Sequence, residues 1–299
     1  MLDDPIISVR GLVTRFGKHT VHDGLDLDVQ RGEIIGIVGG SGTGKSVLLH
    51  AVVGLLKPAA GQITVFGENV RDTGADDYRR LRKRWGVMFQ GGSLFSTLTV
   101  AENVQVPLRE FYPDLGQKLM DEIAAYKVLM AGLPANAGLK YPAELSGGMK
   151  KRAGLARALA LDPRILFYDE PSAGLDPVTS AEIDQLMLDL TRKLGVTSVV
   201  VTHEMDSAFT IADRMVMLDK GRVLKIDTRD AFDAIRTVAD DATEGMTVDD
   251  LLIRQFLRGD PIGPITQRRE DTNYAEDLLN TADPQITRSP AVQATRRSG

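Results

Sequence analysis

The residues best suited to chemistry form a glycine-rich stretch, GGSGTGKS, between Gly39 and Ser46. It fits the pattern G-x-x-x-x-G-K-[ST], follows a short apolar run and opens a segment with helical periodicity. Glycines let backbone N–H groups wrap around phosphates, and the start of the helix adds a partial positive charge. Lys45 would neutralise phosphate charge, and Ser46 would bind Mg²⁺. We therefore predict a nucleotide-binding loop, in preference to a plain glycine-rich turn, formed by Gly39, Gly40, Ser41, Gly42, Thr43, Gly44, Lys45 and Ser46.

Two carboxylates end a second apolar run, RILFYDE. Asp169 is placed to hold Mg²⁺ through water, and Glu170 to orient or deprotonate an attacking water. The same pair could cap the helix that follows. The phosphate-binding loop earlier in the chain favours the catalytic interpretation.

Polar residues follow two further predicted strands: His203 comes after VVVT, and Gln90 after WGVMF. Parallel strands present their carboxyl ends at one edge of a sheet, so both side chains are expected near Glu170. His203 could hydrogen-bond the γ-phosphate, and Gln90 could reach Mg²⁺ or the attacking water. The remaining histidines have no such position and are expected to be structural: His19, His22 and His50.

A second candidate anion site lies in the segment ELSGGMKKRAGLAR, residues 144–157. Ser146, Gly147 and Gly148 would leave N–H groups exposed at a helix start, and the basic run after Met149 adds positive charge. A serine that merely caps the helix is the alternative. Since one loop already holds the phosphates, a second phosphate-binding helix implies another nucleotide.

Strands and helices must alternate to position these residues. Short apolar runs followed by helical periodicity predict an α/β fold with a mainly parallel sheet and helices on both faces. Residues 6–16 and 19–30 alternate apolar and polar residues, as in half-exposed antiparallel strands. Residues 100–140 are predicted to form a helical insertion with breaks at three prolines, namely Pro107, Pro113 and Pro134. Other expected elements are a hairpin near 62–70, a surface helix at 75–84, a helix at 178–194, a closing hairpin at 214–226 and a helix at 243–257.

The composition excludes several classes of protein. The 299 residues have a net charge of −5, which gives no support for nucleic-acid binding, and they include no cysteine for disulfides or cysteine–metal sites. The N-terminus is acidic and unlike a secretory signal, and no apolar run approaches the ~18 residues that span a bilayer. We expect a cytoplasmic or peripheral protein, and any membrane that it serves is spanned by another chain.

The segment LSGGM, residues 145–149 and hereafter the signature segment, is similar to the LSGGQ signature of ATP-binding cassette (ABC) ATPases. Other motifs of that family stand in the same order over residues 6–230: an aromatic residue, the phosphate-binding loop, a glutamine, LSGG, FYDE, SAGLD and a histidine. Met149 replaces the usual glutamine, so a polar contact is lost while the Ser-Gly-Gly site is kept.

This resemblance implies a P-loop NTPase of ABC type with an antiparallel β subdomain and a helical subdomain, active as an ATPase. It implies a head-to-tail dimer, here expected to be a homodimer, with each ATP between the loop of one copy and the signature segment of the other. Phe16 would stack on adenine, and Asp176 would couple the two sites. The implied Mg²⁺ ligands are Ser46, Gln90 and Asp169. The implied catalytic residues are Glu170, His203 and Gln90. The residues that would face the partner's ATP are Ser146, Gly147 and Gly148. We expect a cassette over residues 1–242, with the helical insertion at about 91–160, and a C-terminal helix and arm over 243–299.

Within that family, the signature segment and the stretches at 91–110 and 253–264 resemble the ATPases of MCE-associated, Mla-type lipid transporters. That resemblance implies a membrane permease, a periplasmic MCE-domain protein and a small STAS-domain protein as partners. It also implies phospholipid transport, a place at the cytoplasmic face of the inner membrane and a C-terminal arm that contacts the partner ATPase.

Three alternatives stay open at this point. The cassette motifs fit the ATPase of an amino-acid, metal or drug transporter equally well. A soluble cassette protein acting on DNA or ribosomes is disfavoured, because the chain has no room for a long coiled coil and holds a single cassette. A purely structural role is disfavoured because every catalytic residue type is present. Direction of transport and the identity of the lipid lie outside what this sequence defines.

Overall fold

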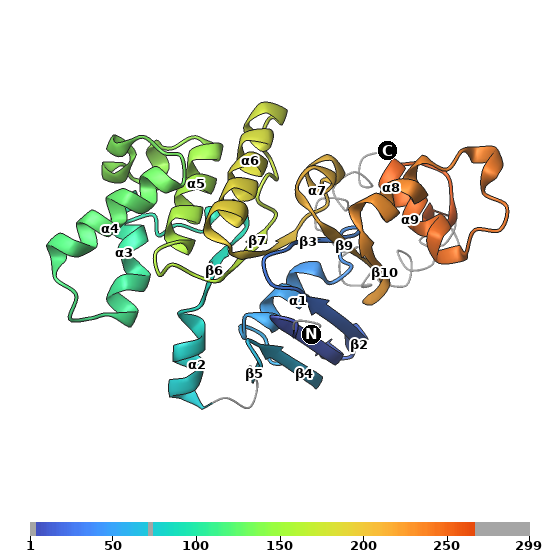
Figure 1. Ribbon diagram of the computed structural model, residues 1–299, viewed down its shortest axis with the longest axis horizontal. Helices are drawn as coiled ribbons and strands as arrows, with labels where there is room; N and C mark the ends of the chain where they lie inside the picture. Colours follow the sequence, from blue (N-terminus) through green and yellow to red (C-terminus); the bar gives the residue numbers. More distant parts are fainter. Residues whose placement is uncertain (1–3, 71–73, 267–299) are drawn as a thin grey trace, which may run out of the picture. The chain divides into compact units, whose positions relative to one another are not determined.

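The computed structural model describes residues 4–70 and 74–266. The chain divides into two compact units, Met1–Thr237 and Val238–Gly299. The first unit holds every residue that the sequence singled out for ATP chemistry (Figure 1). Residues 267–299, on which part of the expected C-terminal arm falls, lie outside the described residues.

A six-stranded sheet forms the centre of the first unit, in the order β10-β9-β3-β8-β7-β6. Neighbouring strands are parallel except for β10, which pairs antiparallel with β9. The strands β3, β7 and β8 are buried at every position, as expected for short apolar runs covered on both faces. The bounds are β3 Ile34–Val38, β6 Trp85–Met88, β7 Ile165–Asp169, β8 Thr197–Val201, β9 Arg214–Asp219 and β10 Arg222–Thr228. The predicted α/β fold is confirmed.

A separate antiparallel sheet has the order β2-β1-β4-β5. Its strands are β1 Ile7–Phe16, β2 His19–Val29, β4 Ala60–Val65 and β5 Glu68–Asn69. The inward-facing residues of this sheet share one core with α1, Lys45–Val52, and with one face of the central sheet. The hairpins expected from alternating residues are thus present.

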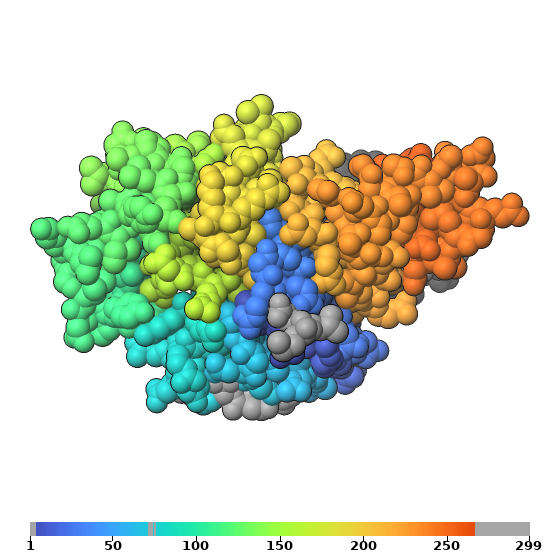
Figure 2. All heavy atoms as spheres, in the orientation of Figure 1, coloured from blue at the N-terminus to red at the C-terminus, as the bar shows by residue number. Residues whose placement is uncertain are grey.

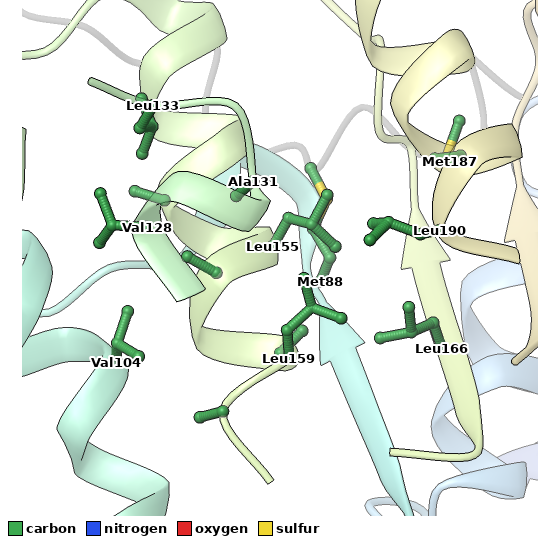
Figure 3. Close-up of a cluster of buried hydrophobic side chains, with 14 of the residues drawn as sticks. Met88, Val104, Val128, Ala131, Leu133, Leu155, Leu159, Leu166, Met187 and Leu190 are labelled. Atoms are coloured by element: carbon green, nitrogen blue, oxygen red, sulfur yellow. The ribbon is translucent and has the colours of Figure 1, made fainter. Parts of the chain in front are cut away.

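The other face of the central sheet packs on helices. The helices α3 Val100–Phe111, α4 Gln117–Met130 and α5 Gly147–Ala158 lie together at one side (Figure 1), and in the space-filling view they form the green lobe of Figure 2. Figure 3 shows Leu155 of α5 and Leu159, which directly follows this helix, beside Met88 of β6 and Leu166 of β7. This core fixes α5 against the strands that end at the candidate site. The remaining helices of the first unit are α2 Ala75–Arg82, α6 Pro177–Leu194, α7 Met205–Ile211 and α8 Arg229–Thr237.

The expected break at Pro107 is wrong, because α3 continues through it. A proline in a helix interior removes one backbone hydrogen bond and costs about 3 kcal/mol. The helix compensates at its start with a capping box between Thr99 and Glu102, and along its length by burying Val104 and Leu108. The breaks at Pro113 and Pro134 do fall between helical segments.

Two further helices differ from expectation. The helix α8 was not expected from the sequence, although Thr228 accepts a hydrogen bond from the N–H of Ala231 and so marks its start. In the second unit, α9 spans Val248–Arg258 and begins later than predicted, because Thr247 caps it by accepting from the N–H of Asp250. No helix among residues 4–70 and 74–266 is long and apolar enough to cross a membrane.

Candidate active site

The phosphate-binding loop connects β3 to α1 in a conformation that requires glycine. Gly44 has φ 100°, and a Cβ there would lie 2.5 Å from Nε2 of His22. A Cβ on Gly39 would lie 2.3 Å from the backbone oxygen of Leu218. A side chain at either position would therefore push the loop away from the strands beneath it.

Lys45 folds back over this loop. Its Nζ donates to the carbonyl oxygens of Gly39 at 2.7 Å and Gly40 at 2.9 Å. Burial lowers the pKa of the Lys45 ammonium, and the carboxylates of Glu170 and Asp169 oppose that shift. The lysine is thus held at the mouth of the loop, where it can exchange carbonyl partners for phosphate oxygens.

His22 supports the loop from below and is fully buried. Its Nδ1 is 2.8 Å from the hydroxyl oxygen of Thr14, and its Nε2 faces Gly44. Burial lowers the pKa of the His22 imidazole, which favours the neutral ring. The expectation that His22 is structural agrees with this place, but its contact with the loop carried no signal in the sequence.

The end of β7 brings Asp169 to the start of α1. The hydroxyl of Ser46 donates to Oδ1 of Asp169 at 2.9 Å. Burial raises the pKa of the Asp169 carboxyl, and this hydrogen bond opposes the rise. A hydroxyl and a carboxylate beside a phosphate-binding loop fit Mg²⁺, which commonly takes one or two protein ligands and completes its shell with water and phosphate. The described residues contain no cluster of three or more His, Cys, Asp or Glu side chains suited to a metal.

Glu170 follows directly, in a backbone conformation that is unusual for its type. Its φ is 51°, in the left-handed region, which costs a non-glycine residue roughly 1–3 kcal/mol. Its N–H donates to the carbonyl of Val201 at 2.9 Å, and its own carbonyl accepts from Nζ of Lys151 at 2.6 Å. Its Oε2 lies 2.9 Å from Nδ1 of His203, whose side chain is 57% exposed. The structure therefore brings Glu170 and His203 together at the edge where the phosphate-binding loop lies.

Gln90 takes the predicted place along the chain but not the predicted contact. It opens a short 3₁₀ turn, Gln90–Gly92, after β6, at the same edge of the sheet. Its side chain is exposed, and among the described residues it makes no hydrogen bond to Ser46 or Asp169. Its proposed role as a ligand or as an aid to catalysis therefore stays a prediction.

The start of α5 gives the capping interpretation of Ser146 a structural basis. The Ser146 hydroxyl accepts from the N–H of Met149 at 3.2 Å. Ser146 and Gly147 are exposed, while Gly148 is buried. Within this chain, as far as it is described, Ser146 makes no hydrogen bond to the phosphate-binding loop. The exposed start of α5 is available to another molecule.

The sequence led us to expect that the basic residues after the signature segment add positive charge at the exposed start of α5. In the structure, they do not all face it. Lys151 is buried and turns to the Glu170 carbonyl. Arg152 donates to the carbonyl of Ala131 and to the carboxylate of Glu182. A helix places consecutive residues about 100° apart, so three adjacent cations cannot share one face.

The last two candidates lie at the ends of secondary-structure elements. Phe16 ends β1 opposite His19, with half of its side chain exposed. Asp176 caps α6 by accepting from the N–H groups of Val178 and Thr179. The Thr179 hydroxyl lowers the pKa of the Asp176 carboxyl. A role for Asp176 between two copies stays a prediction.

Comparison with known proteins agrees with the geometry of the candidate site. The family described as "ABC transporter" matches residues 22–173. Probable ribonucleotide transport ATP-binding protein mkl of Mycobacterium leprae is 37% identical over 273 residues, which are 91% of this chain and 74% of that protein. Intermembrane phospholipid transport system ATP-binding protein MlaF of Haemophilus influenzae is 34% identical over 278 residues, covering 93% of this chain and all of that protein. Methionine import ATP-binding protein MetN of Caulobacter vibrioides is 44% identical over 212 residues, 70% of this chain and 62% of that protein.

A solved structure matches as well. The dimeric, post-hydrolysis state of the ATP-binding cassette MJ0796 bound to ADP and Pi superimposes with a TM-score of 0.69 at 30% identity. The match covers 75% of this chain and 98% of that one. The resemblance to the cassette family found in the sequence is thereby confirmed.

Proposed function

We propose that this chain, which belongs to the ABC transporter family of ATP-binding proteins, powers the transport of phospholipid at a bacterial inner membrane together with an MCE-type system. Its activity as a transport ATPase follows from the family. The lipid substrate is supported by the likeness to a phospholipid transport ATPase over that protein's whole length. The observation that carries the enzymatic part is the meeting of two pairs at one sheet edge, Ser46 with Asp169 and Glu170 with His203.

ATP hydrolysis at this edge divides the work among neighbouring residues. Lys45 leaves the carbonyls of Gly39 and Gly40 to bind phosphate oxygens. Ser46 and Asp169, joined by Gln90 after a movement of its side chain, would hold Mg²⁺, which would supply charge neutralisation at the phosphates. Glu170 accepts a proton from the attacking water, and His203 holds the carboxylate and the γ-phosphate in line. The products are ADP and phosphate.

The proposed partners of this chain are a second copy, a permease and two further proteins. A second copy of the chain would complete each site, with Ser146, Gly147 and Gly148 set against the γ-phosphate on the first copy and Asp176 between the two sites. A permease would receive the motion, as the match to the ABC transporter family supports. An MCE-domain protein and a STAS-domain protein would join the complex at the membrane, with the cassette on its cytoplasmic side. Residues from 243 onward, as far as the structure describes them, would add a contact between the ATPases.

Phe16 is proposed to stack on adenine, and its replacement tests that assignment. Stacking of a base on an aromatic side chain is worth ~1–3 kcal/mol, so Phe16→Ala should weaken ATP binding by ~5- to 150-fold. Tripolyphosphate, which has no base, should bind the variant and the original chain equally. Tyr126→Ala, which removes another exposed aromatic side chain, should leave both affinities unchanged. Equal losses for ATP and tripolyphosphate would assign Phe16 to the shape of the loop instead.

An apolar groove beside the helical lobe suits a permease helix. It has a volume of about 390 Å³, and Leu55, Trp85, Phe95 and Phe111 contribute to its lining. Phe95 and Leu55 are more than half exposed. The backbone at Phe95 is fixed independently of its side chain, since Asn103 bonds both its N–H and its carbonyl. A docked helix that buried these side chains would gain roughly 25 cal/mol for each Å² of apolar surface.

Capture of the complex from native membranes tests this proposal directly. Tagged chain, extracted in mild detergent, should bring down a polytopic permease, an MCE-domain protein and phospholipid, as identified by mass spectrometry. Phe95→Arg should lose the permease and keep its own ATP binding, while Leu139→Arg, exposed outside the groove, should lose neither. Retention of the permease by Phe95→Arg would remove the groove from the proposal.

The same capture separates a second candidate function. The matches to a ribonucleotide transport protein and to a methionine import protein favour another cargo. Recovery of a permease with a solute-binding protein and no MCE-domain protein would establish that alternative. The proposals for the ATP site would stand in either case.

A further inference from the structure

Lys151 makes a contact that neither its sequence motif nor the proposed chemistry uses. It lies in the second turn of α5, it is only 4% exposed, and its Nζ donates to the backbone carbonyl of Glu170 at 2.6 Å. The N–H of Glu170 is bound from the other side by Val201 of β8. The peptide groups on both sides of the Glu170 Cα are therefore tied to different elements of the fold.

These two hydrogen bonds hold a backbone conformation of Glu170 that would not persist without them. Glu170 has φ 51°, a region that side chains other than glycine rarely adopt. Loss of the Lys151 donor would leave a buried carbonyl without its partner and let the backbone relax toward negative φ. The carboxylate would then turn away from Nδ1 of His203, which is 2.9 Å from it in the present arrangement.

The helix that carries Lys151 is itself firmly placed. Gly154 packs so closely that a Cβ there would lie 2.9 Å from the Cα of Gly92. Arg157 donates to the carbonyls of Gly92 at 3.0 Å and Ser93 at 2.8 Å. Leu155 of the same helix and Leu159, its C-cap residue, are buried against β6 and β7 (Figure 3). The ammonium of Lys151 thus reaches Glu170 from a rigid support.

The charges around Lys151 fit a permanent contact. Burial lowers the pKa of the Lys151 ammonium, while the carboxylates of Glu170, Glu204 and Asp169 oppose that shift. A cation with three carboxylates around it gains from its charge as well as from its hydrogen bond.

We propose that Lys151 is a positioning residue for ATP hydrolysis, which holds the Glu170 backbone from the signature helix so that the carboxylate faces the attacking water. This inference rests on the proposed catalytic role of Glu170. Because Ser146 caps α5, any shift of the signature segment on a partner's nucleotide is carried to the Glu170 of its own chain. Lys151 acts on the chemical step. It does not act on ATP binding by the phosphate-binding loop, which depends on Lys45 and Ser46.

Steady-state ATPase assays on the full chain test this assignment. Lys151→Met keeps the length of the stem and removes the charge and the donor. We expect kcat to fall ~10- to 100-fold, the range for one charge-assisted hydrogen bond, with KM for ATP changed by less than about twofold. Lys151→Arg, which retains a cationic donor, should recover most of kcat.

Lys127→Met is the matched control for simple loss of a buried lysine. Lys127 is 3% exposed and donates to Asp162 at 2.5 Å, away from the ATP site. This variant should lose thermal stability and keep kcat. If Lys151→Met loses only stability, as Lys127→Met does, or if both lose kcat to the same degree, the positioning role is overturned.

A double variant separates action through Glu170 from an independent effect. In a Glu170→Gln background, single-turnover hydrolysis should slow little further when Lys151→Met is added, since the carboxylate that Lys151 positions is already gone. If the losses in rate of the two single variants multiplied in the double variant, the inference would be contradicted and the proposed function would stand. An original chain that hydrolyses no ATP would instead refute the proposed function.

Discussion

Glu170→Gln should reduce ATP turnover by ~100- to 10,000-fold, the usual contribution of a general base, while ATP stays bound. The amide keeps the size of the carboxylate and can still contact His203, which lies 2.9 Å from Oε2 of Glu170. It cannot accept a proton from water. The phosphate-binding loop, with Lys45 and Ser46, is untouched by the change. Binding and chemistry are therefore expected to separate in this variant.

The measurement has two parts. Phosphate release gives the turnover, and light scattering after size-exclusion chromatography gives the mass of the chain with and without ATP. The variant should form a stable dimer in ATP, because hydrolysis no longer opens it. Glu182→Gln, at an exposed position paired with Arg152, should behave like the original chain. Unchanged turnover in Glu170→Gln would remove Glu170 from the catalytic role.

Much of this site followed from short-range patterns. The loop from Gly39 to Ser46 could be placed because a buried strand, a glycine pattern and a helix follow one another within a few residues. Asp169, Glu170 and His203 could be placed because each ends a continuous apolar run, and parallel strands gather such ends at one edge. The order of the strands was not needed for that inference.

Contacts that depend on the rotation of a helix could not be predicted from the sequence. In the sequence, Lys151 is one cation among three. It points toward Glu170 only because Leu155 packs against β6 and Gly154 packs against the 3₁₀ turn. The same holds for His22, which lies in β2 and meets Gly44 of the phosphate-binding loop only because the two sheets pack together. The left-handed φ of Glu170 has no sequence signal at all, because glutamate is disfavoured there.

Local rules also misjudged some helices. Pro107 is a helix breaker by its own geometry, yet the capping box and buried face of α3 outweigh the lost hydrogen bond. The helix α8 has apolar residues at helical spacing, but it spans only nine residues and buries only Phe232. Tertiary packing decides such cases, and one sequence gives little information about it.

Ser146 admits both of its interpretations at once. A hydroxyl has one donor and two acceptor positions, so Ser146 can accept from the N–H of Met149 and still donate to a phosphate oxygen. Capping prepares the exposed start of α5 for an anion, since it fixes the first turn whose N–H groups face outward. A ligand supplied by a second copy of the chain is consistent with this geometry.

Ser146→Arg should therefore abolish turnover without abolishing ATP binding. The added side chain would fill the space at the start of α5 that the partner's γ-phosphate is proposed to occupy. Loss of the cap costs helix stability only about 1 kcal/mol, so the chain should fold. We expect turnover to fall at least ~100-fold, because a closed dimer is needed to complete either site. Fluorescent ATP should bind with its original affinity, since the phosphate-binding loop of the same chain is intact.

Mixing the two inactive variants distinguishes sites shared between copies from sites within one copy. In a mixed dimer, the loop and Glu170 of the Ser146→Arg chain meet the intact signature segment of the Glu170→Gln chain. One complete site results. An equal mixture, assembled before ATP is added, should recover up to about a quarter of the original rate, since half of the dimers are mixed and each has one complete site of two. If each chain formed its own site, every site would carry a defect, and the mixture would stay as inactive as its components.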